Sequence, residues 1–416
     1  GGIIRILEKF NLLPAIFFLK SRAECDAALN AAADLRPQIE SGRFPETLEE
    51  LLQRYPALQS HRQWKILRRF GLAAHHGGQL PAWKFVVEEM MKEGHLRVIF
   101  ATSTIAAGVN FPARTIVLFN SDLFNGHNFN PMNATEFRQM TGRAGRRGRD
   151  KIGFMLAVSG RFMDLIHVKK LLFRAPEDIM SQLKNDFAMV LNLLLSQTPF
   201  DIHNIFDKSL AAYQQTKRRP AIEARAAKSI WDDFCRHLAF LKAEGFVGGE
   251  DRLTEDGKWA AKLRLDQPVL VAECLRKGIF PSANEKLMAA IVSMFAYDRD
   301  NEIRVELKNI SPQLLTALKG AIAAVRPLAK RLDDAGFAVS PLYPAAGAAM
   351  YSWAQGRDWD NLIKATGIAE GDMATLVLRT ADNLRQLGAL KETHPDIAAC
   401  AFRARELILR EPVLFV

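Results

Sequence analysis

The residues best suited to chemistry lie in one short segment in which arginines alternate with glycines. Residues 136–149 read EFRQMTGRAGRRGR. Each glycine disfavours a helix by about 1 kcal/mol relative to alanine, so a surface helix gains nothing from this spacing. Glycines let the backbone approach phosphate oxygens closely, and arginine binds phosphate through paired hydrogen bonds. The pattern therefore favours phosphate contact over its alternative, a solvated charged face.

Two further segments place small and polar residues where a predicted strand ends. Residues 75–84 read HHGGQLPAWK, and the N–H groups at the start of the following helix suit an anion. The two histidines have no third ligand at a suitable spacing, so we predict no metal site. Residues 100–114 read FATSTIAAGVNFPAR, with hydroxyl groups at the carboxyl end of a strand, where open α/β sheets bind ligands.

The elements that position these segments alternate in type along the first third of the chain. Short runs that are apolar on both faces predict strands, and a helical pattern over 83–93 separates two of them. Such runs are typical of a parallel sheet covered on both sides, which predicts an α/β domain. The predicted strands are 15–19, 72–75, 98–102, 115–119 and 153–158.

Helical periodicity replaces strand patterns from Ile166 onward, with helices predicted over 180–195 and 227–244. Within 238–257, a helix ending at Gly245, a short strand, a Gly-Gly turn, a returning strand and a helix capped by Thr254 predict a winged-helix module. An incidental hairpin in a helical domain is the alternative. The remainder, from Val269, is predicted to be helical.

Composition narrows the class of protein. The chain has 416 residues, enough for about three domains, and 56 Lys and Arg against 46 Asp and Glu give a net charge of +10, which favours a polyanionic partner. The four cysteines are far apart and form no CxxC pair, so we expect no disulfide framework and a reducing cytoplasm. The apolar run at 12–19 is too short to span a bilayer, so we predict no membrane contact.

At these segments the sequence resembles the second RecA-like domain of superfamily-two helicases, specifically the superkiller-type DExH RNA helicases and their archaeal repair-helicase relatives. AIFFLKSRAEC at 15–25 is similar to motif IV and 75–81 to the intermediate motif. ATSTIAAGVNFPAR at 101–114 is similar to motif V, and QMTGRAGRRG at 139–148 to motif VI. Downstream, 181–194 and 350–387 resemble the family's stretch before its winged-helix domain and its carboxy-terminal helical domain.

The resemblance implies three domains: a second RecA-like domain over 1–162, a winged-helix-like domain over 163–268 and a helical, ratchet-type domain over 269–416. No GxxxxGK[ST] loop and no DExH box occurs in the 416 residues. We therefore expect the first RecA-like domain, which would hold most of the Mg²⁺ with ATP, to be a missing partner, and expect the chain alone not to hydrolyse ATP.

The resemblance also implies roles for individual residues. Arginine fingers of such a lobe stabilise charge on the transferring phosphoryl group and contribute about a thousandfold or more in rate. By motif position, the catalytic residues are Arg143, Arg146 and Gln139, and the ATP-binding residues are Gly108, Asn110 and Gly142. The residues expected to hold the nucleic-acid backbone are Thr102, Thr104, His76 and Gly77.

Two further expectations concern strand separation and translocation. Asn125-Gly126, between Phe124 and Phe129, predicts a two-residue hairpin turn, and the family's hairpin at this place separates the duplex; an ordinary surface loop is the alternative. Arg379 and Asp382 match base-contacting positions of the family's ratchet helix. Their alternative is an ion pair within the helix, because residues three apart share a face.

These observations predict the carboxy-terminal portion of an ATP-dependent RNA helicase that translocates 3′ to 5′ and unwinds duplexes in RNA processing or decay. One alternative is a DNA-repair helicase of the related branch, because the motif V sequence suits both. The other is a binding module without catalysis, in which the motif VI arginines would have no task.

Overall fold

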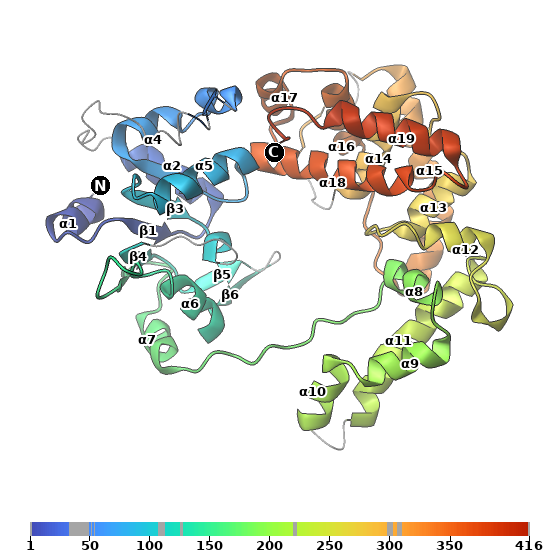
Figure 1. Ribbon diagram of the computed structural model, residues 1–416, viewed down its shortest axis with the longest axis horizontal. Coiled ribbons are helices and arrows are strands. Elements are labelled where there is room, and N and C mark those ends of the chain that lie inside the picture. The colour runs from blue at the N-terminus through green and yellow to red at the C-terminus, as the bar shows by residue number, and fades with distance from the viewer. Residues whose placement is uncertain are drawn as a thin grey trace. The chain divides into compact units, whose positions relative to one another are not determined.

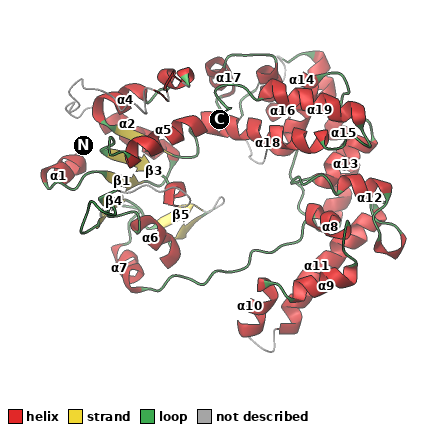
Figure 2. Cartoon of the chain, viewed as in Figure 1, coloured by secondary structure: helices red, strands yellow, loops and turns green. Residues whose placement is uncertain are grey.

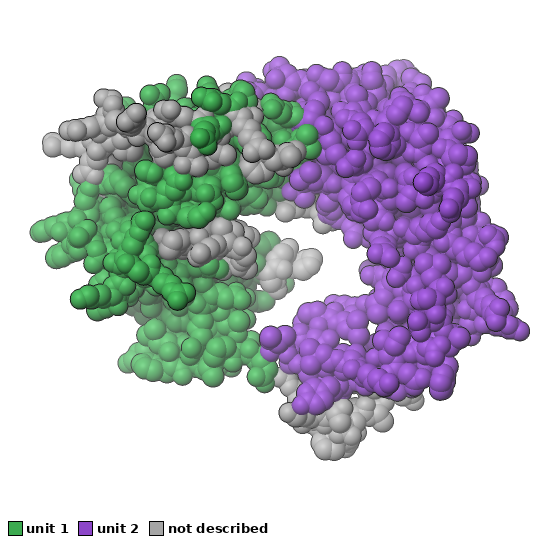
Figure 3. Space-filling view, viewed as in Figure 1, with its two compact units in different colours: residues 1–178, 369–374, 411–416 green, residues 179–368, 375–410 purple. Residues whose placement is uncertain are grey.

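The computed structural model describes residues 2–32, 50, 52–53, 55–106, 113–124, 128–218, 223–297, 303–305 and 310–414. It divides into two compact units (Figure 3). Unit 1 comprises 1–178, 369–374 and 411–416, and unit 2 comprises 179–368 and 375–410. The expected boundary at 162 therefore lies inside unit 1, and the further division at 268 stays a prediction.

Unit 1 contains a five-stranded sheet in the order β2-β3-β1-β4-β7, with every neighbouring pair parallel. This order confirms the predicted parallel α/β architecture, and each predicted strand agrees with the observed one within one residue at each end. The strands are β1 (Ala15–Phe18), β2 (Leu72–His75), β3 (Val98–Ala101), β4 (Thr115–Leu118) and β7 (Phe154–Ala157).

Helices bury the sheet because its strands are apolar on both faces (Figure 1). Phe17, Leu72 and Phe100 share one core with Leu7 of the first helix and Leu29 of the second. Pro81 begins α5 two residues before the predicted start, because its fixed φ suits the first helical position. The helical elements of unit 1 are α1 (Gly2–Lys9), α2 (Arg22–Ala32), η1 (Pro56–Ser60), α4 (Trp64–Phe70), α5 (Pro81–Lys92), η2 (Ser103–Ala106), α6 (Ala134–Thr141) and α7 (Leu165–Phe173).

The predicted hairpin between the segments 100–114 and 136–149 is present as β5 (Asp122–Phe124) and β6 (Phe129–Pro131). Phe124 pairs directly with Phe129, so four residues separate the strands and the expected two-residue turn is wrong. Residues 125–127, including Asn125 and Gly126, lie outside the described part of the chain.

Unit 2 is helical, and the cartoon shows no strand in its described residues (Figure 2). The last long helix, α18, begins in unit 1 and continues into unit 2. The helices that lie wholly or partly in unit 2 are α8 (Phe187–Leu194), α9 (Pro199–Asp207), α10 (Leu210–Arg218), α11 (Glu223–Ala243), η3 (Gly249–Asp251), α12 (Glu255–Ala260), α13 (Pro268–Arg276), α14 (Glu285–Ala296), α15 (Pro312–Asp334), α16 (Pro344–Ala354), α17 (Trp359–Thr366), α18 (Glu370–Gly388) and α19 (Pro395–Ile408).

Two expectations for this region need correction. The helix predicted over 180–195 is confined to α8, because the Asp186 side chain accepts a hydrogen bond from the Met189 N–H and caps the helix there. The predicted wing is a single antiparallel bridge between Val247 and Leu253, with η3 in place of a strand pair. Thr254 does cap α12 as predicted, through the Gly257 N–H.

Candidate functional site

The arginine-glycine segment forms a tight turn at the end of α6. Asn133 and Glu136 form a capping box that starts the helix, and the helix ends at Thr141 with Gly142 at its carboxyl cap. Gly145 has a φ of +89°, a conformation that glycine adopts without a steric penalty. Residues 142–150, hereafter the motif VI turn, therefore leave the helix after Thr141, two residues beyond Gln139, which lies on the exposed face of the helix.

The motif VI turn is hydrogen-bonded to Ala113, which lies two residues before β4. The Ala113 N–H donates to the Arg143 carbonyl over 3.1 Å, and the Gly145 N–H donates to the Ala113 carbonyl over 2.7 Å. On the other side, a Cβ on Gly153 would lie 2.5 Å from the carbonyl carbon of Ala144. Tertiary structure therefore brings together the ends of the segments likened to motifs V and VI.

Asp150 fixes the orientation of Arg146. Its carboxylate accepts hydrogen bonds from Arg146 Nε over 2.7 Å and Nη2 over 3.0 Å. The Nε of Arg114 lies 3.8 Å from the same carboxylate. The hydrogen bonds from Arg146 lower the pKa of Asp150 to about 2, so the carboxylate is ionised at neutral pH. Sequence reasoning missed Asp150, although its position four residues after Arg146 and directly after the Arg-Gly run was a usable signal.

The remaining predicted ATP and nucleic-acid residues are placed only in part. Gly108 and Asn110 lie outside the described residues, and Gly142 is exposed at the cap of α6. Thr102 is half-buried directly after β3, at the carboxyl edge of the sheet as predicted. Thr104 is the second residue of η2, and its side chain lies outside the described part of the structure.

His76 does not lie on an open surface, and Gly77 beside it is half-buried. His76 is 2% exposed, its Nε2 lies 3.2 Å from an Asp26 carboxylate oxygen, and its Nδ1 accepts from the Gly78 N–H. His75 is also buried and pairs with Glu88 over 3.0 Å. A buried imidazole with both nitrogens engaged cannot bind a nucleic-acid strand in this conformation, which corrects the expectation for His76.

The hairpin carries a group of exposed aromatic rings. Phe124 is 53% exposed and Phe129 45% exposed, and their ring centroids lie 5.1 Å apart. The Lys20 ammonium lies 4.1 Å from the centroids of both Phe129 and Phe162 and pairs with Asp122 over 2.7 Å. Lys20 therefore holds the hairpin to the segment after β1, and its position within the motif IV resemblance, directly after the predicted strand 15–19, was the signal that pointed to it.

The two predicted ratchet residues each form an ion pair with another side chain. Arg379 pairs with Asp266, and Asp382 pairs with Arg385 over 2.7 Å. Both residues lie on α18, and the suggested pair between Arg379 and Asp382 stays a prediction. Both side chains remain partly accessible on α18.

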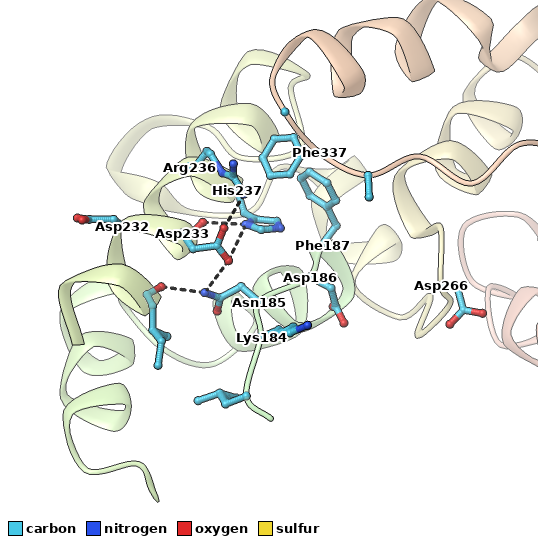
Figure 4. A pocket seen from close by; sticks show the side chains of 14 residues that line it. Lys184, Asn185, Asp186, Phe187, Asp232, Asp233, Arg236, His237, Asp266 and Phe337 are labelled. Atoms are coloured by element: carbon cyan, nitrogen blue, oxygen red, sulfur yellow. Dashed lines mark hydrogen bonds and ion pairs between the residues drawn. The ribbon is translucent and has the colours of Figure 1, made fainter. Parts of the chain in front are cut away.

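Unit 2 also holds a cleft of about 860 Å³, which the segment 183–187 and α11 line together (Figure 4). Phe187, His237 and Phe337 form an aromatic cluster with centroid distances between 4.6 and 4.8 Å. The Asn185 amide donates to Asp233 over 3.2 Å and to the Ile230 carbonyl over 2.8 Å. These contacts anchor the segment before α8 to α11.

The charges around this cleft oppose a phosphate ligand. Its lining cations are Lys184 and Arg236, and Arg236 pairs with Asp233 over 2.7 Å. The lining carboxylates are more numerous: Asp186, Asp232, Asp233 and Asp266. We therefore interpret the cleft as a structural junction of unit 2 and place no nucleic-acid contact in it.

The described residues contain no group of three His, Cys, Asp or Glu side chains that could hold a metal ion. None of the helices in the described ranges is both long enough and apolar enough to cross a bilayer.

Comparison with known families agrees with this geometry. Residues 47–148 match the helicase conserved C-terminal domain, and this range covers α5, strands β2, β3 and β4, and most of the motif VI turn. Residues 250–416 match the DSHCT (NUC185) domain. Together the two matches support the carboxy-terminal portion of a superkiller-type superfamily-two RNA helicase.

Individual relatives support the same family. The chain is 36% identical to "Probable helicase HelY" of Mycobacterium tuberculosis over 51% of its length, and 38% identical to a chloroplastic DExH-box ATP-dependent RNA helicase of Arabidopsis thaliana over 45%. It is 28% identical to "Superkiller complex protein 2" of Homo sapiens over 80%. These alignments span 24%, 16% and 27% of the relatives' own lengths. The chain therefore matches about a quarter or less of each relative.

Proposed function

We propose that this chain supplies the second RecA-like lobe and the helical region of an ATP-dependent RNA helicase that moves 3′ to 5′ and unwinds duplexes. The observation that carries the proposal is the motif VI turn, in which a tertiary network holds two arginines beside the amino-terminal ends of β4 and β7. Phosphoryl transfer needs such fixed cations, because its catalysis consists mainly of positioning and charge stabilisation.

The residues of the turn fit a nucleotide phosphate. Asp150 holds Arg146 through Nε and Nη2, and within the described residues its Nη1 has no hydrogen-bond partner, so one edge of the guanidinium can donate to a phosphate oxygen. Arg143 lies three residues earlier, and Gln139 is exposed on the last turns of α6. In this proposal both arginines stabilise the transferring phosphoryl group, and Gln139 orders the phosphate network.

The other part of the nucleotide site would come from a first RecA-like lobe. ATP supplies the phosphoryl group, and by the family resemblance Mg²⁺ would be held mainly by that lobe. From this chain, Gly108, Asn110 and Gly142 would contact the nucleotide.

RNA would be held by contacts that are largely independent of sequence. Thr102 and Thr104 lie after β3, and Arg379 and Asp382 lie on α18, where they would contact the strand and its bases. The exposed Phe124 and Phe129 of the hairpin would separate the duplex, because aromatic faces stack on unpaired bases. Three relatives carry RNA helicase or superkiller names, which favours RNA over DNA.

The deciding experiment is an ATPase assay of the 416-residue chain mixed with the first RecA-like lobe of the same protein, with and without RNA. We expect RNA-stimulated turnover, and we expect Arg143→Ala or Arg146→Ala to lower kcat by about a thousandfold. Arg147→Ala, an equal loss of charge in the same turn, is the control and should retain most of the activity.

Two outcomes would contradict the proposal. Turnover that survives both alanine substitutions would remove the finger assignment. A verified complex of the two lobes without any turnover would remove the helicase activity and favour a binding module.

A further inference from the structure

The loop that follows β2 is covered by the first turn of α18. Ala369–Ala374 belong to unit 1, and the Gly371 N–H donates to the Gly78 carbonyl over 3.1 Å. A Cβ on Gly371 would lie 2.4 Å from the carbonyl oxygens of Gly77 and Gln79. Real Cβ atoms do not approach backbone this closely, so only glycine allows this contact. Residues 76–79 are hereafter the His76 loop.

An ion pair closes the same contact from the side. Arg22, the first residue of α2, reaches Asp372 over 2.5 Å, and the Asp372 carboxylate is only 7% exposed. A Cβ on Gly77 would lie 3.1 Å from the Arg22 guanidinium, so that side chain lies between the His76 loop and α18. Because Asp372 is nearly buried, loss of its partner leaves an unpaired charge that is costly to keep.

A second pair lies beside the first. His61 Nε2 lies 3.5 Å from the Glu370 carboxylate, and the His61 ring stacks on Trp83 with centroids 3.8 Å apart. Burial lowers the pKa of His61 despite the adjacent Glu370. The lowered pKa favours the neutral form of His61, so its contact with Glu370 adds little ionic attraction.

The underside of the His76 loop is fixed by Asp26. Its carboxylate contacts His76 over 3.2 Å, Gln63 over 3.1 Å and Arg62 over 2.9 Å. Burial opposes ionisation of Asp26, but the hydrogen bond from His76 and the charge of Arg62 outweigh it and lower its pKa. Asp26 therefore fixes one side of the His76 loop, and the first turn of α18 covers the other side.

We propose that the His76 loop is the docking site of α18, and that Arg22, Gly371 and Asp372 are positioning residues for the RNA contacts of that helix. Arg379 lies eight residues after Gly371, about 12 Å further along an uninterrupted helix. A helix is stiff, so a change at its first turn shifts the groups two turns away. The inference rests on the proposed RNA-binding function and replaces a direct RNA contact by His76 and Gly77.

The test measures binding of fluorescent single-stranded RNA to the 416-residue chain at several salt concentrations. We expect Asp372→Asn and Gly371→Ala to weaken binding about fivefold, without changing the slope of log affinity against log salt. The slope counts phosphate contacts, and these substitutions remove none. Glu392→Gln, an equal loss of charge at an exposed site, should change nothing.

Charge reversal keeps the proposal testable if one variant folds poorly. Arg22→Asp alone should weaken binding, and adding Asp372→Arg should restore most of it, because the pair is rebuilt with opposite polarity. Wild-type affinity in Asp372→Asn and Gly371→Ala would overturn the proposal. So would a salt slope that falls by about one in Arg22→Gln while Asp372→Asn binds more tightly, since both results would mark Arg22 as a phosphate contact.

Amide hydrogen exchange of the chain without RNA separates this proposal from the proposed function. Asp372→Asn should accelerate exchange at the Gly371 and Asp372 amides and onward to Arg379, and the charge-reversed pair should restore protection. If the wild-type chain binds no RNA, the proposed function fails, and exchange alone decides whether the docking site exists. Unchanged exchange in Asp372→Asn would refute the docking site whatever the RNA result.

Discussion

The motif VI turn and the His76 loop are two glycine-rich segments of unit 1 that looked alike in sequence. In the turn, Arg147 and Arg149 are exposed, and backbone hydrogen bonds to Ala113 hold the turn from behind. In the His76 loop, the side chains of His76 and Gln79 are buried, and the backbone of Gly77 and Gly78 contacts Gly371, which also belongs to unit 1. The comparison shows that glycine indicates a place where another group comes close to the backbone. The neighbouring side chains decide whether that group belongs to a ligand or to the protein itself.

The largest effect on folding should come from the close contact behind the motif VI turn. Gly153→Ala places a Cβ 2.5 Å from the Ala144 carbonyl, and we expect a loss of about 3 kcal/mol in the free energy of unfolding. Gly148→Ala is the matched control: its φ is +77° but no atom lies within 4 Å, so strain alone should cost about 1 kcal/mol. Chemical denaturation measures both, and equal losses would show that the turn is not packed from behind.

Asp150 should make the stability of the motif VI turn depend on pH. Its folded pKa of about 2 lies below the ordinary value of 3.8, so its contribution is present above about pH 4 and is lost as the pH falls toward 2. We expect Asp150→Asn to lose up to about 2 kcal/mol at neutral pH. The difference from wild type should shrink in acid, and denaturation curves between pH 2 and pH 7 test this. A constant difference across that range would contradict the ion pair.

The smallest effect should come from the exposed edge of the His76 loop. Arg62 contacts Asp26 but is half-exposed, and exposed pairs contribute about 1 kcal/mol or less. Arg62→Gln should therefore lower stability by less than about 1 kcal/mol and leave the salt dependence of RNA binding unchanged. A lower salt slope would mean that this edge of the loop does contact phosphates, which would make the two segments alike after all.

The sequence by itself determined the sheet and the motifs. A strand that is apolar on both faces is stable only inside a sheet that is covered on both sides. For this reason the bounds of β1, β2, β3, β4 and β7 could be predicted within one residue. The order and wording of four segments indicated the helicase family, which the matches over 47–148 and 250–416 confirm. Caps such as Thr254 were also predictable, because a cap is a contact within four residues.

Only tertiary structure decided what each segment contacts. The pairing of Arg146 with Asp150 is local, but the joining of Ala113 to Gly145 depends on where two distant segments meet. The predicted wing is reduced to one antiparallel bridge, Val247 with Leu253, because a Gly-Gly turn predicts a reversal of the chain and not the length of the paired ladder. The contact of Gly371 with the His76 loop joins residues that lie almost 300 positions apart in the sequence. Such a contact follows from tertiary packing, which no local pattern of residues encodes.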